Sequence, residues 1–219
     1  MSSSGTYTSN PFDNGELVEE SYERCGIDPA TLTQRHTVSA RRSMGLLFTE
    51  WEQESVRLFQ VDEQTQTVTD GDSDYTVASG TLLILDGVIR RSSVDTYVSR
   101  ISREQYHLIP NKTQEGMPSQ VYHDIGAGTY YLWPTPENST DVFRYNRLRR
   151  IQDVGTAQQH PDVQRLWLEA LCAGLAAKLA LKFAYERVAT LNALAEKSFR
   201  LAKIADRERH DTEITVGGV

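Results

Sequence analysis

Hydrophobic residues recur at helical spacing near both ends of the chain. On this basis four helices are predicted, over residues 14–26, 37–60, 161–183 and 186–207. Asn14 is expected to be the N-cap of the first helix, and Gly26 is expected to end it. Both ends of the chain are therefore predicted to be helical.

The apolar positions of these helices form stripes at steps of three and four residues, which indicates that each helix buries one side. Small residues at 173–177 would let another helix pack closely there. The last helix is expected to bury the side that carries Leu191, Leu194, Leu201 and Ala205. The residues expected to form the core of these helices are Met44, Leu47, Trp51, Leu166, Trp167, Leu171 and Leu175.

Between residues 64 and 153 the pattern changes to the alternation that is typical of strands. Tyr97 is expected to face outward and Val98 inward, and Gly87 suggests a bulge. Ser102 and Gln105 form a capping box for a short helix. The predicted strands cover residues 64–69, 81–90, 96–101, 120–124, 129–133 and 141–148.

The order of these patterns predicts an α+β fold. The N- and C-terminal helices would form one helical bundle, into which an antiparallel β domain is inserted. The expected parts are a flexible N-terminal arm over 1–13, the helical bundle over 14–62 and 154–210, the β domain over 63–153, and a C-terminal tail over 211–219.

Composition excludes several classes of protein. The 219 residues are 39% hydrophobic and 24% charged, and no apolar run is long enough to cross a membrane. The first ten residues lack the pattern of a signal peptide. The two cysteines, Cys25 and Cys172, fit no metal or redox spacing, so we expect a reducing compartment and no disulfide.

Charge is negative overall and unevenly placed. The formal net charge of −7 argues against a protein that grips nucleic acid along a basic face. Residues 50–74 carry eight acidic side chains, whereas four arginines crowd into 144–150. Such segregation is consistent either with solvated faces or with contacts between the opposite patches of neighbouring subunits.

A search for catalytic and ligand-binding motifs finds no support for chemistry. The five histidines are dispersed, and Asp70, Asp72 and Asp74 lack the glycine and glutamate that a calcium loop needs. The loop with Gly126 and Gly128 is not a phosphate loop, and no nucleophile elbow exists. We therefore expect no enzyme, metal site or cofactor.

Several strings of residues, however, match a known family. Residues 40–51 read ARRSMGLLFTEW, which resembles the second helix of phage head-to-tail adaptor proteins, where A-R-R-S-L-N-L-M-x-x-E-W is typical. Residues 100–112, 116–120 and 131–136 are similar to the middle section of that family, and residues 175–180 and 205–209 to its C-terminal helices. Their order and spacing make the resemblance fairly specific.

The resemblance implies a structural role. Members of this family, also called tail tubular protein A or gatekeeper in short-tailed phages, are noncatalytic ring subunits between the portal and the tail. The ring extends the DNA channel, and the number of its copies typically matches the twelve of the portal. The implied partners are the portal protein, the tail (nozzle) protein below it, other copies of the chain, and phage DNA that passes without sequence-specific binding. The implied location is the virion, after assembly in the host cytoplasm, with no membrane contact.

Two other functions stay open at this point. A nucleic-acid-binding accessory protein is the main alternative, because of the arginines in 144–150. A hydrolase that acts on the cell wall during DNA entry is a more distant one.

Two sets of residues are candidates for the adaptor function. A like-charged channel wall would keep DNA from sticking, and the lining candidates are Glu50, Glu52, Glu54, Asp70, Asp72 and Asp74. The C-terminal tail is polar except for two β-branched residues that would suit docking into another chain. The portal-binding candidates are Arg207, Arg209, Ile214 and Val216.

Overall fold

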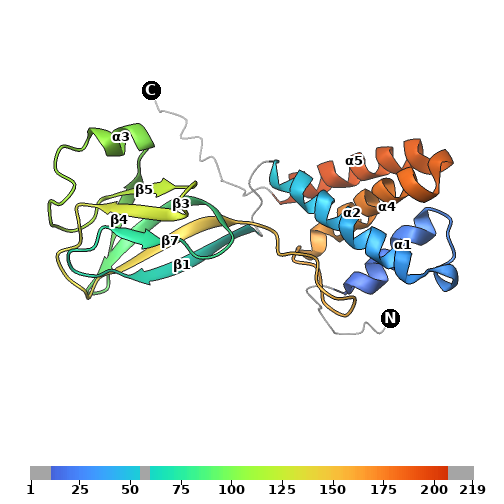
Figure 1. The fold of residues 1–219 in the computed structure, drawn as a ribbon, viewed down its shortest axis with the longest axis horizontal. Coiled ribbons are helices and arrows are strands. Elements are labelled where there is room, and N and C mark those ends of the chain that lie inside the picture. Colours follow the sequence, from blue (N-terminus) through green and yellow to red (C-terminus); the bar gives the residue numbers. More distant parts are fainter. Residues whose placement is uncertain (1–10, 55–59, 207–219) are drawn as a thin grey trace, which may run out of the picture. The chain divides into compact units, whose positions relative to one another are not determined.

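The computed structural model describes residues 11–54 and 60–206, and its fold is mixed α+β (Figure 1). The described chain divides into two compact units. Residues 11–54 and 151–206 form the helical unit, and residues 60–150 form the β unit. Each unit has a separate apolar cluster of buried residues. The β unit is bounded at 59/60 and 150/151. The predicted boundaries of the β domain, 62/63 and 153/154, each lie three residues later.

Helix α1 (Asn14–Arg24) begins one residue earlier than predicted, because Asn14 is its first helical residue and not its N-cap. The N-cap is Asp13, whose carboxylate accepts a hydrogen bond from the Glu16 N–H at 2.8 Å, while the Glu16 carboxylate accepts from the Asp13 N–H at 3.0 Å. The prediction of Asn14 as the cap is therefore wrong. Asn14 is buried, and its side-chain amide donates to the Thr156 carbonyl instead.

Helix α2 (Gln34–Glu52) starts and ends earlier than predicted. Thr33 and His36 form its capping box, and Gln53 is its C-cap. The expected extension to Gln60 is wrong, because the last residue of α2 is Glu52. Strand β1 begins at Val61. The short 3-10 helix η1 (Pro29–Thr31) connects α1 to α2.

The chain returns to the helical unit through η3 (Arg165–Trp167), α4 (Leu168–Phe183), η4 (Tyr185–Arg187) and α5 (Val188–Ala205). Leu166 is 39% exposed, so its assignment to the core is wrong. It lies in the 3-10 turn before α4, in which the neighbouring Trp167 takes the buried position. The other six residues predicted to form the core, Met44, Leu47, Trp51, Trp167, Leu171 and Leu175, are buried.

The buried side of α5 also differs from the expected one. Leu191, Ser198 and Ala202 are buried, whereas Leu201 is 56% exposed. The expected stripe is therefore wrong at Leu201 and at Ala205, which is exposed too. Helix α5 has apolar residues on two adjacent sides, and only one of them meets the core.

The β unit is a seven-stranded sheet with the order β1-β7-β3-β4-β5-β6-β2. All neighbouring strands pair antiparallel except β4 and β5, which are parallel. The chain crosses between these two through α3 (Arg103–Leu108), so the expected purely antiparallel sheet is corrected at one pair. The strands are β1 (Val61–Thr67), β2 (Asp74–Thr76), β3 (Thr81–Arg91), β4 (Val94–Arg100), β5 (Gln120–Asp124), β6 (Thr129–Trp133) and β7 (Val142–Arg149).

Local details of the sheet follow from particular side chains. Tyr97 is 64% exposed and Val98 is fully buried, as the alternation predicted. The capping box of Ser102 and Gln105 is confirmed at the start of α3. The bulge expected at Gly87 is wrong, because the register shifts between β3 and β7 lie earlier in β3. Gly87 instead makes room for Phe143, whose ring would lie 2.6 Å from an added Cβ.

Candidate interaction site

Helix α4 is the centre of the helical unit, because helices that are hydrophobic all round are buried. All its residues from Ala170 to Ala177 are buried, and α1, α2 and α5 pack against it. Helix α2 comes close at Gly174, where an added Cβ would lie 2.9 Å from Leu47 Cδ2. The close helix packing expected at the small residues 173–177 therefore occurs at Gly174.

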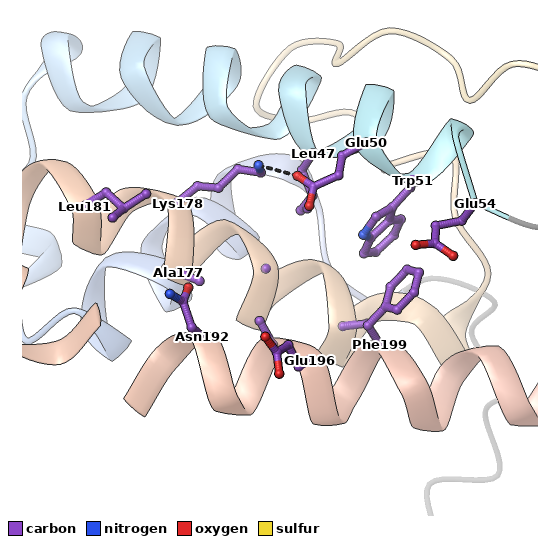
Figure 2. A pocket seen from close by; sticks show the side chains of 13 residues that line it. Leu47, Glu50, Trp51, Glu54, Ala177, Lys178, Leu181, Asn192, Glu196 and Phe199 are labelled. Carbon is purple, nitrogen blue, oxygen red and sulfur yellow. Dashed lines mark hydrogen bonds and ion pairs between the residues drawn. The ribbon is translucent and has the colours of Figure 1, made fainter. Parts of the chain in front are cut away.

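An open groove runs along α4 between α2 and α5 (Figure 2). Its volume is about 450 Å³, and its floor consists of Ala170, Gly174 and Ala177, which follow one side of α4. Because Ala170 and Ala177 are small, space remains between the two flanking helices beside the contact of Leu47 with Gly174. The walls are formed by Leu47 and Trp51 of α2 and by Asn192, Ala195 and Phe199 of α5.

Charged side chains surround this apolar floor. Lys178 donates to the Glu50 carboxylate at 2.5 Å, and Lys203 donates to the Glu54 carboxylate at 2.7 Å. Both pairs are partly exposed, so each contributes about 0–1 kcal/mol to stability. Glu196 lines the groove as well and has no ion pair within the described residues. An apolar centre with a charged rim is the arrangement found in protein–protein interfaces.

Aromatic rings hold α2 and α5 together at one end of the groove. The Trp51 ring centroid lies 5.3 Å from that of Trp167 and 5.6 Å from that of Phe199, and Figure 2 shows Trp51 and Phe199 facing each other. Trp51 is 4% exposed and Trp167 fully buried. Packed aromatic side chains of this kind fix their neighbours in place, so this end of the groove is well defined.

The predicted channel-lining residues are divided between the two units. In the helical unit, Glu50 and Glu52 lie in the last turn of α2 and Glu54 follows its C-cap. The Glu52 carboxylate accepts a hydrogen bond from the Ile151 N–H at 3.1 Å. Since Glu50 and Glu54 pair with lysines, their negative charge is largely balanced within the chain.

The other three candidates, Asp70, Asp72 and Asp74, lie in the β unit around the turn between β1 and β2. All three are exposed, and none forms an ion pair within the residues that the structure describes. The free carboxylates among the six channel-lining candidates are therefore these aspartates.

The portal-binding candidates Arg207, Arg209, Ile214 and Val216 lie outside the described residues. The expected N-terminal arm lies mostly outside them too, and so does the C-terminal tail from residue 211.

Three of the four arginines in residues 144–150 pair with carboxylates of β1. Arg144 donates to Glu63 at 2.5 Å, and Arg147 donates to Asp62 at 2.6 Å. Arg147 is 8% exposed, and its guanidinium also donates to two backbone carbonyls. Its hydrogen bond to Asp62 holds the pKa of that carboxyl below the usual range. These side chains therefore join β1 to β7, which weakens the basis for a nucleic-acid-binding accessory protein.

Within the described residues, no group of three or more histidine, cysteine, aspartate or glutamate side chains is arranged to hold a metal ion. Cys25 and Cys172 are buried thiols, and burial raises the pKa of Cys172 to about 11. None of the helices in the part of the chain that is described has the length and apolar character needed to span a membrane.

Sequence reasoning missed the groove. Lys178, Asn192 and Glu196 were not among the predicted site residues, although Lys178 interrupts the apolar run of α4 and its charge must reach the surface. That interruption is the signal in the sequence that could have indicated a solvent-facing strip on an otherwise buried helix.

A helical unit with an open apolar groove, joined to a separate β unit, defines a protein suited to binding other protein chains. Comparison with family models identifies which one. The chain belongs to the SU10 adaptor protein family, whose model matches residues 39–217. It is thus a phage structural adaptor, a component of the virion that interacts with other head and tail proteins, and its family is not a known enzyme family. A comparison with curated proteins gives no match.

Proposed function

We propose that the protein is a ring subunit that connects the portal to the tail and extends the DNA channel. The observation that carries this proposal is the family match over residues 39–217, which includes the whole β unit and most of the helical unit. By its resemblance to tail tubular protein A and gatekeeper proteins, the ring would contain twelve copies, with the portal above and the tail nozzle protein below.

Attachment to the portal is assigned to the C-terminal residues Arg207, Arg209, Ile214 and Val216. The end of α5 supports this choice, because Leu201 and Ile204 are 56% and 57% exposed just before that segment. Exposed apolar side chains at the end of α5 are suited to docking into a cleft of another protein.

DNA would pass through the ring without lasting contacts. Asp70, Asp72 and Asp74 support this part of the proposal, because exposed carboxylates repel phosphates. If this is correct, filter binding at ~150 mM salt should detect only weak DNA binding that falls further as salt rises. Tight, salt-resistant binding would instead favour a dedicated nucleic-acid-binding protein.

Particle images test the proposal directly. Purified protein should be imaged alone and after mixing with portal rings of the same phage, and we expect an added ring of density on the tail-facing side of the portal. Portal rings that stay bare at saturating protein concentration would contradict the proposal. Rings bound to the side of the portal that faces away from the tail would also contradict it.

A further inference from the structure

Helix α2 has a face that is largely exposed among the residues that the structure describes. The face follows one side of the helix at steps of three and four residues, and its apolar members Val38 and Leu46 are 41% and 64% exposed. We call it the outer α2 face. Its residues are Val38, Arg42, Gly45, Leu46 and Thr49.

Gly45 makes this face unusual. Glycine is among the least favourable residues in a helix interior, yet Gly45 stands in the middle of α2. Apart from its two chain neighbours and the backbone of its own helix, no atom of the described residues lies within 4 Å of the position that its Cβ would take. Packing among the described residues therefore gives no reason for a glycine at this position, whereas close approach of another chain would give one.

The outer α2 face and the groove match in length and character. From Val38 to Thr49 the face spans about 16 Å, and the α4 strip from Ala170 to Leu181 spans about the same distance. The face presents the exposed apolar side chains of Val38 and Leu46, and the groove has an apolar floor with an open top.

Unpaired charges on the two surfaces are opposite. Arg35 and Arg42 are exposed and form no ion pair with any described residue, and they border a second hollow that contains Lys182 and no carboxylate. On the rim of the groove, Glu196 is the carboxylate that lacks an ion pair within the described residues. Complementary charges of this kind fix the orientation of two chains in an interface.

We infer that the outer α2 face of one copy packs into the α2–α4–α5 groove of the next copy, with Arg42 close to Glu196. The contact joins two different surfaces, so it is head-to-tail and can close into a ring. This inference rests on the proposed function, because it assigns the subunit contact of the proposed ring.

Charge reversal tests the pairing. Arg42→Glu and Glu196→Arg should each raise the protein concentration needed for half-maximal ring formation on portals by roughly tenfold or more, since each places like charges together. The double variant should recover most of the loss, because it restores an opposite pair. Lys197→Glu, on α5 but outside the groove lining, is the matched control and should assemble like the wild type.

Cross-linking tests the geometry independently of charge. Val38→Cys and Asn192→Cys place one thiol on the outer α2 face and one at the groove, and the natural cysteines are both buried. Rings assembled from an equal mixture of the two variants should form disulfide-linked dimers on mild oxidation, whereas rings of either variant alone should not. Circular dichroism should show that each variant is folded before assembly.

The outcomes separate the two claims. If wild-type rings form and neither the reversals nor the mixed thiols have the expected effect, the inference is wrong and the proposed ring stands. If Val38→Cys cross-links to itself, the contact is two-fold and the head-to-tail arrangement is wrong. If the wild type forms no ring on portals, the proposed function fails, and the inference fails with it.

Discussion

At the scale of single residues, the three packed rings of Trp51, Trp167 and Phe199 hold the helical unit together. They come from α2, η3 and α5, elements far apart in the sequence, and their centroids lie 5.3–5.6 Å apart. Removal of one ring would leave a cavity that the neighbouring helices cannot fill without moving.

We therefore expect Trp167→Ala to lower the free energy of unfolding by ~3–5 kcal/mol. Urea denaturation followed by circular dichroism measures this change. Tyr185→Ala is the control, because Tyr185 is 81% exposed and its loss should change stability by less than about 0.5 kcal/mol. Equal losses for both variants would show that Trp167 is not part of the core.

His123 is a single residue whose ionisation affects the β unit. It is 8% exposed, burial lowers its pKa, and its Nδ1 accepts a hydrogen bond from the Ile84 N–H at 3.4 Å. The unfolded chain takes up a proton near pH 6.5 while the folded chain does not. Stability should therefore fall as pH falls below about 6.5, and level off below the folded pKa.

The measurement is the melting temperature of the β unit between pH 5 and 8, by scanning calorimetry. His123→Asn keeps a hydrogen-bond acceptor but does not titrate, so its melting temperature should fall less between pH 6.5 and 5 than that of the wild type. If both proteins lose the same amount over this range, other groups control the pH dependence.

Some residue positions could be predicted from the sequence and others could not. Strict alternation located the buried Val98 and the exposed Tyr97 correctly, because a strand offers only two faces. Leu166 was placed wrongly, since the tighter 3-10 turn around it turns side chains away from the directions that α-helical spacing predicts. The partners of Glu50 and Glu54 depend on contacts between distant helices, which spacing along the chain does not reveal.

At the scale of elements, the hairpin between β3 and β4 has a two-residue turn that the sequence hardly indicates. Arg91 pairs with Val94, and between them Ser92 and Ser93 have φ angles of 47° and 68°. Two positive φ angles in a two-residue hairpin turn are typical of type I′, which favours asparagine followed by glycine. Serine carries a steric cost in this region of about 1–2 kcal/mol.

Ser93→Gly should therefore stabilise the β unit by about 0.5–1 kcal/mol, after allowing for the greater freedom of glycine in the unfolded chain. Thermal unfolding of the full chain measures the gain. Ser99→Gly is the matched control, because Ser99 lies inside β4, where glycine should cost a similar amount. Destabilisation by both changes would mean that Ser93 tolerates its positive φ without strain.

The bounds of elements were predicted correctly where turn residues stand directly beside a strand. Strands β5 and β6 have the predicted bounds, because alternating residues are followed directly by the turn that contains Gly126 and Gly128. The end of α2 was misplaced, since the apolar spacing continues beyond the last helical residue. The parallel pairing of β4 with β5 could not be predicted, because strand order is decided by how the connection with α3 packs.

At the scale of the whole molecule, attachment and folding should be separable. The buried apolar cluster that the structure describes in the helical unit consists of side chains between Leu17 and Ala202. Deletion of Asp211 to Val219 should therefore leave thermal unfolding unchanged but weaken or abolish assembly on the portal. If the truncated protein covers portals at the wild-type concentration, attachment must depend on the helical unit or the β unit instead.

The groove is the feature of the whole molecule that sequence analysis did not find. Small residues at 173–177 indicated close packing on α4, and Leu47 against Gly174 is that packing. The open strip beside it exists because α2 and α5 lie on α4 without covering it completely. Such incomplete coverage depends on the angles between the helices. The spacing of apolar residues along the chain does not determine these angles.

The two connections to the β unit have a consequence for how such proteins change over time. Strands β1 and β7 are neighbours, with Val61 opposite Leu148, so the chain enters and leaves the β unit at adjacent points. In the helical unit the corresponding ends are also adjacent, because Glu52 accepts a hydrogen bond from the Ile151 N–H. A segment with adjacent ends can be exchanged by recombination without disturbing the fold that receives it. Phages could therefore replace the β unit as a whole while keeping the same helical unit.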